Sequence, residues 1–562
     1  MPTYPRLAAA SADRDRPSRS WALTALLPLC GACGPEVLPP DLGGEPLWAP
    51  LEQPGDDLGE PSDAVPSGER QGPGTITLTD VTAAAGLETI GAGGNTHGVG
   101  LAFTDLTGDD LPDIVVISGQ SNVSGLWTQP RFLVNLGDGT FANRSNESGL
   151  LDLLLGRDGY SVAAGDIDND GDVDLYVGAQ PTDLLLVNQG DGTFVDGTLS
   201  ASAGGPPSDP SLVGNGKSKV VSLGDIDNDG WLDIVSASST LPFPGLYVLH
   251  NRGDGTFDDI TDDAGAAIDP TGNPCAVMFS DFDTDADRDL WIWNDRGGKV
   301  LLANDGTGHF TDITTESGLD AVQIANPMGI DAADIDHDGD LDVYVSNIGN
   351  NPLLRNNGDG TFVDITNRAG TGGQYGWGLA FEDFNLDGWP DIFVAQEDDR
   401  PNLVFENAGT SPPTFRRIDV PHRPVLDEVA AHNVAAAFAD YDGDGRVDVL
   451  TARTDGGRLT LYRNETDVGS AGWLRVRIDA PPGLETSGVG ARVVVRTGDP
   501  DDGLLQFRDV TGGSSRASQN DLSVRFGLGQ FRGATWVGVL WPTGEQTLIQ
   551  NVGAGQTLTV RP

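Results

Sequence analysis

The sequence predicts an all-β protein in which a seven-bladed β-propeller is followed by a small β-sandwich domain. Three observations support this fold class. An aspartate-rich loop recurs seven times, an Asn-x-Gly-Asp-Gly-Thr-Phe turn follows most of these loops, and short apolar runs alternate with glycine turns after the last repeat. We place the propeller at residues 75–466 and the sandwich at residues 467–562.

The composition points to a large acidic protein. The chain has 562 residues, which is too long for one ordinary core and favours several domains or a repeat architecture. It contains 84 Asp and Glu against 33 Lys and Arg, for a formal net charge of −51. Such a charge repels nucleic acid and anionic membranes, so neither is expected as a partner. It also destabilises a compact state unless a counter-charge is present, and divalent cations are the obvious candidates.

Residues 1–33 have the layout of a secretory signal peptide, with a basic region, the apolar run 21–29 and then small residues. The apolar run is too short to span a bilayer. The segment before Cys33 also resembles a bacterial lipoprotein signal, in which the cysteine is lipidated after cleavage. We therefore expect an exported protein, either secreted or held as an outer-membrane or cell-surface lipoprotein. Membrane contact is expected only through that possible lipid on Cys33.

Residues 34–74 are rich in proline, glycine and acidic residues, and have few apolar positions to bury. Such a segment cannot offset its ordering entropy, so we predict a disordered linker. The three cysteines are Cys30, Cys33 and Cys275. Only Cys275 lies in the predicted folded part, so no internal disulfide framework is expected.

The repeated loop has the form D-x-[DNT]-x-D-x-x-x-D and recurs about every 56 residues. Hard oxygen donors at loop positions 1, 3, 5 and 9 suit Ca²⁺, which accepts six to eight oxygen ligands. Five loops carry glycine at position 6, where a sharp turn is needed. Position 12 is never glutamate, which excludes an EF-hand. We therefore predict up to seven bound Ca²⁺ ions.

The predicted metal ligands are the residues at those four positions in each loop. They are Asp105, Thr107, Asp109 and Asp113; Asp166, Asp168, Asp170 and Asp174; Asp225, Asp227, Asp229 and Asp233; Asp281, Asp283, Asp285 and Asp289; Asp334, Asp336, Asp338 and Asp342; Asp383, Asn385, Asp387 and Asp391; and Asp440, Asp442, Asp444 and Asp448.

The turn that follows each loop completes a four-stranded unit. Copies such as NLGDGTF at Asn135 and NNGDGTF at Asn356 place Asp-Gly between two strand-like runs, which is a strong hairpin signal. Four strands repeated seven times indicate a propeller. The last unit ends at Asn464 without an outer strand, and residues 77–87 could supply it. Such a swap favours a closed ring.

These motifs resemble the FG-GAP/VCBS repeat family, whose calcium-binding blades also build the head of integrin α subunits. The resemblance covers roughly residues 75–466. It implies a weaker first loop, where Thr107 replaces a carboxylate and Asp110 replaces glycine, and a doubtful fourth loop with Ala286 at position 6. The strings GVGARV, FGLG at Phe526 and WPTG at Trp541 resemble the ASPIC/UnbV domain. Together the two parts resemble the cartilage acidic protein family, bacterial branch.

The first functional hypothesis is an extracellular calcium-binding scaffold for ligand binding or adhesion at the cell surface. Its partner would be an unknown protein or glycan, and the chain would be a monomer. The alternative is a glycan-active hydrolase or lyase that uses the central propeller face. No Ser-His-Asp order, nucleophile elbow, P-loop or HExxH motif is found in the sequence, so we expect no enzyme. A purely structural surface protein cannot be separated from the first hypothesis.

A ring of residues eight positions before each loop should surround the mouth of the central channel, opposite the calcium loops. Its members are His97, Asp158, Lys217, Asn273, Asn326, Tyr375 and His432. Two positions later come Val99, Tyr160, Lys219, Cys275, Met328, Trp377 and Val434. We select His97, Tyr375, Trp377 and His432 as candidate ligand-binding residues. The polar ring could equally reflect a solvated mouth, and His250, His309 and His337 are expected to be solvated.

Overall fold

The computed structural model describes most of the chain after residue 73. The described residues are 74–88, 99–118, 129–180, 182–201, 218–238, 245–266, 273–295, 298–324, 326–373, 375–397, 400–421, 433–453, 459–480, 486–498, 503–513 and 515–562. The predicted signal peptide with Cys33, and the predicted linker up to residue 73, lie outside them, as do His97, Lys217 and His432. No helix among the described residues is long and apolar enough to cross a membrane.

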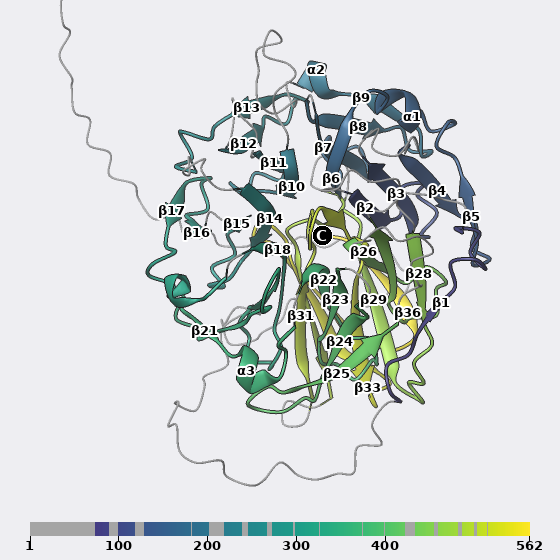
Figure 1. Cartoon of the computed structure of the whole chain (residues 1–562), viewed down its shortest axis with the longest axis vertical. Helices are drawn as coiled ribbons and strands as arrows, with labels where there is room; N and C mark the ends of the chain where they lie inside the picture. The colour runs from purple at the N-terminus through teal and green to yellow at the C-terminus, as the bar shows by residue number, and fades with distance from the viewer. Residues whose placement is uncertain are drawn as a thin grey trace, which may run out of the picture. The chain divides into compact units, whose positions relative to one another are not determined.

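The described residues of the repeat region form seven sheets, here called blades, each built from four antiparallel strands of the repeat region (Figure 1). A fifth strand, from the C-terminal domain, joins the first sheet. Blade 1 is β2 (Val99–Thr104), β3 (Asp113–Ser118), β4 (Arg131–Asn135) and β5 (Phe141–Asn143). Blade 2 is β6 (Asp158–Gly165), β7 (Asp174–Gln180), β8 (Leu184–Asn188) and β9 (Phe194–Asp196). Blade 3 is β10 (Ser218–Gly224), β11 (Asp233–Ser238), β12 (Gly245–Asn251) and β13 (Phe257–Asp259). Blade 4 is β14 (Asn273–Ser280), β15 (Asp289–Asp295), β16 (Gly298–Asn304) and β17 (Phe310–Asp312).

The remaining blades follow the same order. Blade 5 is β18 (Pro327–Ala333), β19 (Asp342–Asn347), β20 (Leu353–Asn356) and β21 (Phe362–Asp364). Blade 6 is β22 (Gly376–Glu382), β23 (Asp391–Gln396), β24 (Asn402–Asn407) and β25 (Phe415–Val420). Blade 7 is β26 (Asn433–Ala439), β27 (Asp448–Arg453), β28 (Leu459–Asn464) and β1 (Leu78–Asp80). Single helical turns, α1 (Leu150–Leu153), α2 (Thr198–Ala201), η2 (Leu319–Ala321) and α3 (Thr366–Ala369), come after four of the outer strands.

The inner strands contact one another in cyclic order, β2–β6–β10–β14–β18–β22–β26 and back to β2. Small residues allow this close approach: a Cβ added at Gly100 would lie 3.0 Å from the Ser161 backbone. The predicted closure is confirmed, because β1 pairs antiparallel with β28, with Leu78 opposite Asn464 (Figure 1). The last blade is therefore completed by chain from both ends of the repeat region.

The asparagine of each turn links its blade to the preceding one. Its Nδ2 donates to the backbone carbonyl of the second loop residue in the neighbouring blade, at 2.8–3.0 Å. The pairs are Asn135–Tyr441, Asn188–Leu106, Asn251–Ile167, Asn304–Ile226, Asn356–Phe282, Asn407–Ile335 and Asn464–Phe384. Because both partners are buried, each bond satisfies groups that water cannot reach.

The C-terminal part is a sandwich of two sheets. One sheet has the order β33 (Val524–Gly529), β29 (Gly472–Ile478) and β36 (Gln556–Val560). The other has the order β31 (Leu505–Asp509), β30 (Arg492–Thr497), β34 (Gly533–Leu540) and β35 (Gln546–Gly553). Leu474, Val493 and Val537 belong to its core. The same apolar cluster includes Leu223 of blade 3, so the two domains share buried surface.

Residues 511–513 and 515–523 of the C-terminal domain, here called the channel segment, run along the inner strands. Within it, β32 (Ser518–Gln519) pairs parallel with β2. The segment also accepts backbone N–H bonds from the strands of five other blades: from Ala164, Leu223, Ile330, Leu379 and Phe438. Inner strands leave unpaired polar groups on the channel side, and the channel segment satisfies part of them.

Candidate functional site

Each aspartate-rich loop is held by backbone hydrogen bonds to its own carboxylates. The ninth-position aspartate is fully buried in all seven loops. In blade 2, Asp174 accepts the N–H of Ile167 at 3.0 Å and that of Asn188 at 2.8 Å. The first-position Asp166 accepts the N–H of Gly171 at 2.9 Å. The two outer positions of the loop pattern therefore fix its shape.

The turn requires left-handed backbone at two positions. Position 6 has positive φ not only at glycines such as Gly171 but also at Asp110 (φ 73°) and Ala286 (φ 77°). Position 4 has positive φ as well, for example at Leu386 (φ 59°). Non-glycine residues rarely adopt this region of backbone conformation. Asp110 and Ala286 therefore keep the same turn as the glycines, but at a cost in backbone strain.

The loop carboxylates converge into compact clusters. In at least four of the described loops, three carboxylates each offer an oxygen within 4.8 Å of the others: Asp166, Asp168 and Asp174; Asp225, Asp227 and Asp233; Asp281, Asp283 and Asp285; and Asp334, Asp336 and Asp342. Among the described residues, one buried oxygen in each of Asp168, Asp227, Asp281 and Asp336 has no hydrogen-bond partner. Carboxylate oxygens gathered in this way fit the ligand preference of Ca²⁺, although His250 Nδ1 also lies within the cluster of the third loop, 3.1 Å from Asp233 Oδ1.

Electrostatics make these clusters costly without a cation. Burial raises the pKa of Asp113 and of Asp225 to about 7 and that of Asp383 to about 8. The pKa of Asp174 lies well above its usual range for the same reason, and the nearby carboxylates of Asp168 and Asp166 raise it further. Burial and carboxylate repulsion both disfavour the ionised form of these side chains. A bound divalent cation would favour the ionised form and so offset both effects.

The C-terminal domain contacts several loops directly. Thr486 Oγ1 donates to the Asp166 carboxylate. Arg475 Nη2 lies 3.5 Å from Asp110 Oδ1. At the fourth loop, Arg492 Nη1 lies 3.2 Å from Asp281 Oδ2, and both side chains are buried.

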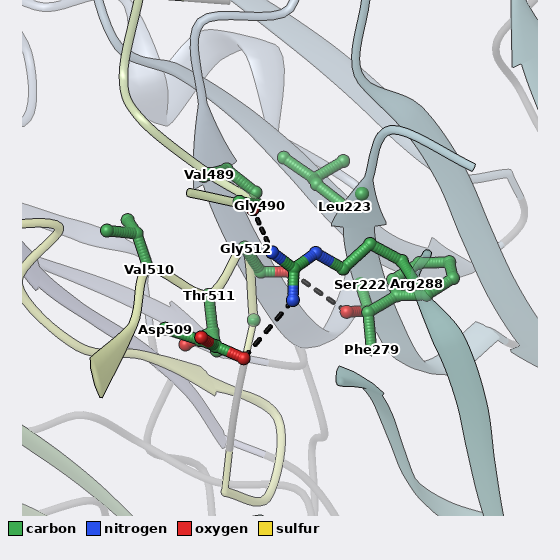
Figure 2. Close-up of a pocket in the computed structure, with 12 residues that line it drawn as sticks. Ser222, Leu223, Phe279, Arg288, Val489, Gly490, Asp509, Val510, Thr511 and Gly512 are labelled. Carbon is green, nitrogen blue, oxygen red and sulfur yellow. Dashed lines mark hydrogen bonds and ion pairs between the residues drawn. The ribbon is translucent and has the colours of Figure 1, made fainter. Parts of the chain in front are cut away.

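The fourth loop differs most from the others. Arg288, at its eighth position, donates to the Gly490 carbonyl and, at 3.1 Å, to Asp509 (Figure 2). No bond from the sixth residue to Asp281 is found among the described residues, in contrast to the other six loops. Protein guanidinium groups therefore supply positive charge beside this loop.

Two of the three histidines are not solvated as expected. His250 Nδ1 lies 3.1 Å from Asp233 Oδ1, and this hydrogen bond raises the pKa of His250 to about 9. His337 stacks on Trp389 with ring centroids 4.0 Å apart, and burial lowers the pKa of His337 to about 4. Only His309 is exposed, as expected. The prediction was wrong for His250 because this residue, near the end of β12, reaches Asp233 in the loop of its own blade. It was wrong for His337 because this loop residue packs against Trp389 in the loop of the next blade.

A cavity of about 400 Å³, here called the channel pocket, lies at the starts of the inner strands. Its lining includes Tyr160, Lys219, Cys275, Met328 and Trp377, which are members of the second predicted ring. Of the first ring, Asn273 lines the pocket. Of the selected ligand residues, Trp377 lines it, whereas Tyr375 lies under Arg400, 4.0 Å from ring centroid to Cζ. His97 and His432 lie outside the described residues.

Sequence reasoning missed the other residues of the channel pocket, among them four that carry charge or come from the channel segment. Asp295 is the last residue of the second strand of blade 4, and Glu397 directly follows the second strand of blade 6. Arg516 and Ala517 belong to the channel segment. The period of the repeat could have located Asp295, which ends β15, and Glu397, which follows β23. No signal in the repeat could have located Arg516.

Comparison with known proteins agrees with this architecture. The model for the FG-GAP-like repeat matches residues 105–177, 225–292, 281–345, 342–394 and 383–451, and the model for ASPIC and UnbV matches residues 482–562. Cartilage acidic protein 1 of Xenopus tropicalis is 24% identical over 469 residues, covering 69% of this chain and 70% of that protein. Human cartilage acidic protein 1 is 23% identical over 481 residues, covering 83% of this chain and 62% of that protein.

Among solved structures, the chain is similar to BBS1N in complex with ARL6DN. The identity is 12%, the TM-score is 0.42, and the match covers 66% of this chain and 94% of that chain. The family models, by contrast, match more than half of the sequence and coincide with the blades and the sandwich described above. The chain therefore belongs to the FG-GAP-like repeat family and ends in an ASPIC and UnbV domain.

Proposed function

We propose that the protein is an exported, calcium-binding β-propeller scaffold that binds a ligand or mediates adhesion at the cell surface, and that it is not an enzyme. The observation that carries the proposal is the convergence of buried carboxylates in the loops, where oxygens such as Asp168 Oδ1 and Asp336 Oδ1 have no hydrogen-bond partner among the described residues. Up to seven Ca²⁺ ions would bind there, one in each loop.

Calcium in these loops would be structural. Each loop joins the first two strands of a blade, so a bound ion would hold both strand ends and offset the carboxylate repulsion. Extracellular modules bind Ca²⁺ with Kd of about 10⁻⁴–10⁻³ M. At millimolar calcium, each site would then add on the order of 1 kcal/mol to the free energy of unfolding. The fourth loop should bind most weakly, because Arg492 already lies beside Asp281.

Export is supported by the signal-like residues 1–33, with lipidation of Cys33 as one route to surface attachment. A surface environment would also supply the millimolar calcium that such sites need. The ligand would bind at the channel mouth, where side chains from several blades meet in the channel pocket.

The proposal is tested by thermal unfolding of the full chain in calcium and after chelation. We expect a large decrease in Tm on chelation and full recovery with Ca²⁺. Magnesium should restore Tm poorly, because it demands tight octahedral geometry. An unchanged melting curve in chelator would show that the loops do not stabilise the fold through calcium. Turnover of a glycan under the same conditions would instead favour the hydrolase or lyase alternative.

A further inference from the structure

The channel pocket is a composite of five blades and the C-terminal domain. Five successive inner strands each contribute at least one residue, and the equivalent position in each strand is Tyr160, Lys219, Cys275, Met328 and Trp377. Arg516 and Ala517 of the channel segment complete the lining. Its volume of about 400 Å³ falls in the range of small-molecule binding sites.

Arg516 is held rigidly in this pocket. Its side chain is about nine-tenths buried, its Cζ lies 4.0 Å from the centroid of the Trp377 ring, and its Nη1 lies 3.3 Å from the Val434 carbonyl oxygen. Burial lowers the pKa of Arg516 to about 10, although Asp295 and Glu397 act in the opposite direction. The guanidinium therefore stays charged at neutral pH and offers donors in a fixed plane.

The polar groups of the wall are also fixed. Lys219 Nζ donates to Asn273 Oδ1, and Asn273 Nδ2 donates to Asp295 Oδ2 at 3.1 Å. Asn326 Nδ2 donates to the other oxygen of Asp295. These bonds form a chain across blades 3, 4 and 5, so donors and acceptors are positioned before any ligand arrives.

The charges of the channel pocket are balanced. Lys219 and Arg516 are cationic, and Asp295 and Glu397 are anionic. A ligand with a net charge would meet a like charge in the wall, and an anion would also be repelled by a protein of net charge −51. Hydroxyl groups both donate and accept, so a polyhydroxylated neutral ligand satisfies both kinds of partner.

The pocket also offers apolar surface. Trp377, Met328 and Tyr160 come from three different blades and line the same cavity as the charged groups. Aromatic and thioether side chains pack well against the C–H face of a ring while polar groups hold its edge. This combination distinguishes a sugar ring from an amino acid or a simple carboxylate.

We propose that the channel pocket binds a neutral saccharide unit, with Arg516 of the C-terminal domain as one of its fixed donors. This inference rests on the proposed role as a ligand-binding scaffold and specifies the class of ligand. Because Arg516 comes from the ASPIC and UnbV domain, the binding site would need both domains.

The test uses the calcium-loaded full chain and a matched panel of sugars in isothermal titration. The panel holds neutral glucose, galactose, lactose and cellobiose, anionic glucuronate and galacturonate, and cationic glucosamine and galactosamine. We expect at least one neutral sugar to bind and its charged counterparts to bind at least tenfold more weakly. Tighter binding of a uronate or an amino sugar, or no binding of any neutral sugar, would overturn the proposal.

Single substitutions then test whether the sugar binds in the channel pocket. Lys219→Met and Arg516→Met should each weaken binding of the best neutral sugar about tenfold or more. Arg417→Met on β25 removes a cation that is 49% exposed and should leave binding unchanged. Because Arg516 is buried, Arg516→Met could also disturb the fold, so Lys219→Met, at a partly buried residue, is the decisive variant. Parental affinity in Lys219→Met would overturn the assignment.

Thermal unfolding with and without calcium is recorded on every protein in this test. Calcium-dependent melting without sugar binding would overturn the saccharide inference alone and leave the calcium scaffold intact. Loss of the calcium effect in the parent protein would instead overturn the proposed function.

Discussion

Asn135 Nδ2 donates a 2.9 Å hydrogen bond to the carbonyl oxygen of Tyr441, and this bond joins the first blade to the last. The same amide donates to Pro112 O at 3.2 Å, and Asn135 Oδ1 accepts the N–H of Gly137 at 3.0 Å. One asparagine therefore fixes its own hairpin turn, its own loop and the neighbouring blade. Each of the other six blades forms the equivalent hydrogen bond to the blade before it, so all seven contacts between neighbouring blades contain the same bond.

Asn135→Ala should lower the free energy of unfolding by about 1–3 kcal/mol for each buried partner left unsatisfied. Chemical denaturation in saturating calcium measures this loss. Asn357→Ala is the matched control, because Asn357 follows the equivalent residue of blade 5 but is exposed. Equal stability of the two variants would show that the link between blades carries no net energy.

Deleting residues 77–87 should expose the edge of β28 and promote aggregation. The deletion removes β1, whose pairing with β28 otherwise covers that edge. Size-exclusion chromatography and thermal unfolding report the effect, with a deletion of equal length within residues 34–73 as the control. A soluble monomer of parental stability would mean that the ring closes without this strand.

Ala286→Gly should stabilise the fold by about 1 kcal/mol, because it removes the cost of a side chain at φ 77°. The reverse change, Gly171→Ala, should destabilise by a similar amount. A Cβ at Gly171 meets nothing within 4 Å, so its cost would come from the backbone alone. A neutral Ala286→Gly beside a destabilising Gly171→Ala would indicate that the fourth loop relaxes in another way.

Gln519→Leu should destabilise the whole protein by about 1–3 kcal/mol for each buried donor that it leaves unpaired. Gln519 Oε1 accepts the N–H groups of Ala164, at 3.1 Å, and Gly513, at 2.6 Å, inside the channel. Gln556→Leu, the same change at an exposed position of β36, is the control. If both variants unfold at the parental denaturant concentration, the channel segment does not contribute to stability.

Asp331→Asn should reduce the pH dependence of stability between pH 5 and pH 8. Burial raises the pKa of Asp331 to about 7, so its protonated form is favoured in the folded state. Such a group contributes stability below its unfolded pKa, and this contribution is lost as the pH rises through about 7. The variant cannot ionise, and its amide oxygen can still accept the Phe381 N–H, which lies 2.8 Å from Asp331 Oδ2.

The expected result is therefore a variant that is more stable than the parent at pH 8, with a smaller difference at pH 5. Denaturation curves at both pH values in saturating calcium measure it. Parallel pH profiles for the two proteins would contradict the raised pKa of Asp331.

Short-range rules in the sequence were sufficient to predict the loops, the hairpins and the closing strand. A loop such as 166–174 contains its own turn and its own carboxylates, and an Asp-Gly turn determines which strands pair. Because the last unit lacks an outer strand, residues 77–87 were predicted to supply it. The pairing of Leu78 with Asn464 confirms this prediction. Each of these features depends on neighbours along the chain or on the period of the repeat.

The sequence by itself therefore determined the all-β class, the four-stranded repeat, the carboxylates of each loop and the strand that closes the ring. Only the tertiary structure decided that the polar channel segment pairs with the inner strands, that Arg492 lies beside Asp281, and that Arg516 lines the channel pocket. The physical reason is that a polar segment such as 515–523 has no periodicity of its own. Its partners are unpaired backbone groups from six blades, and these face one channel only after the ring has closed.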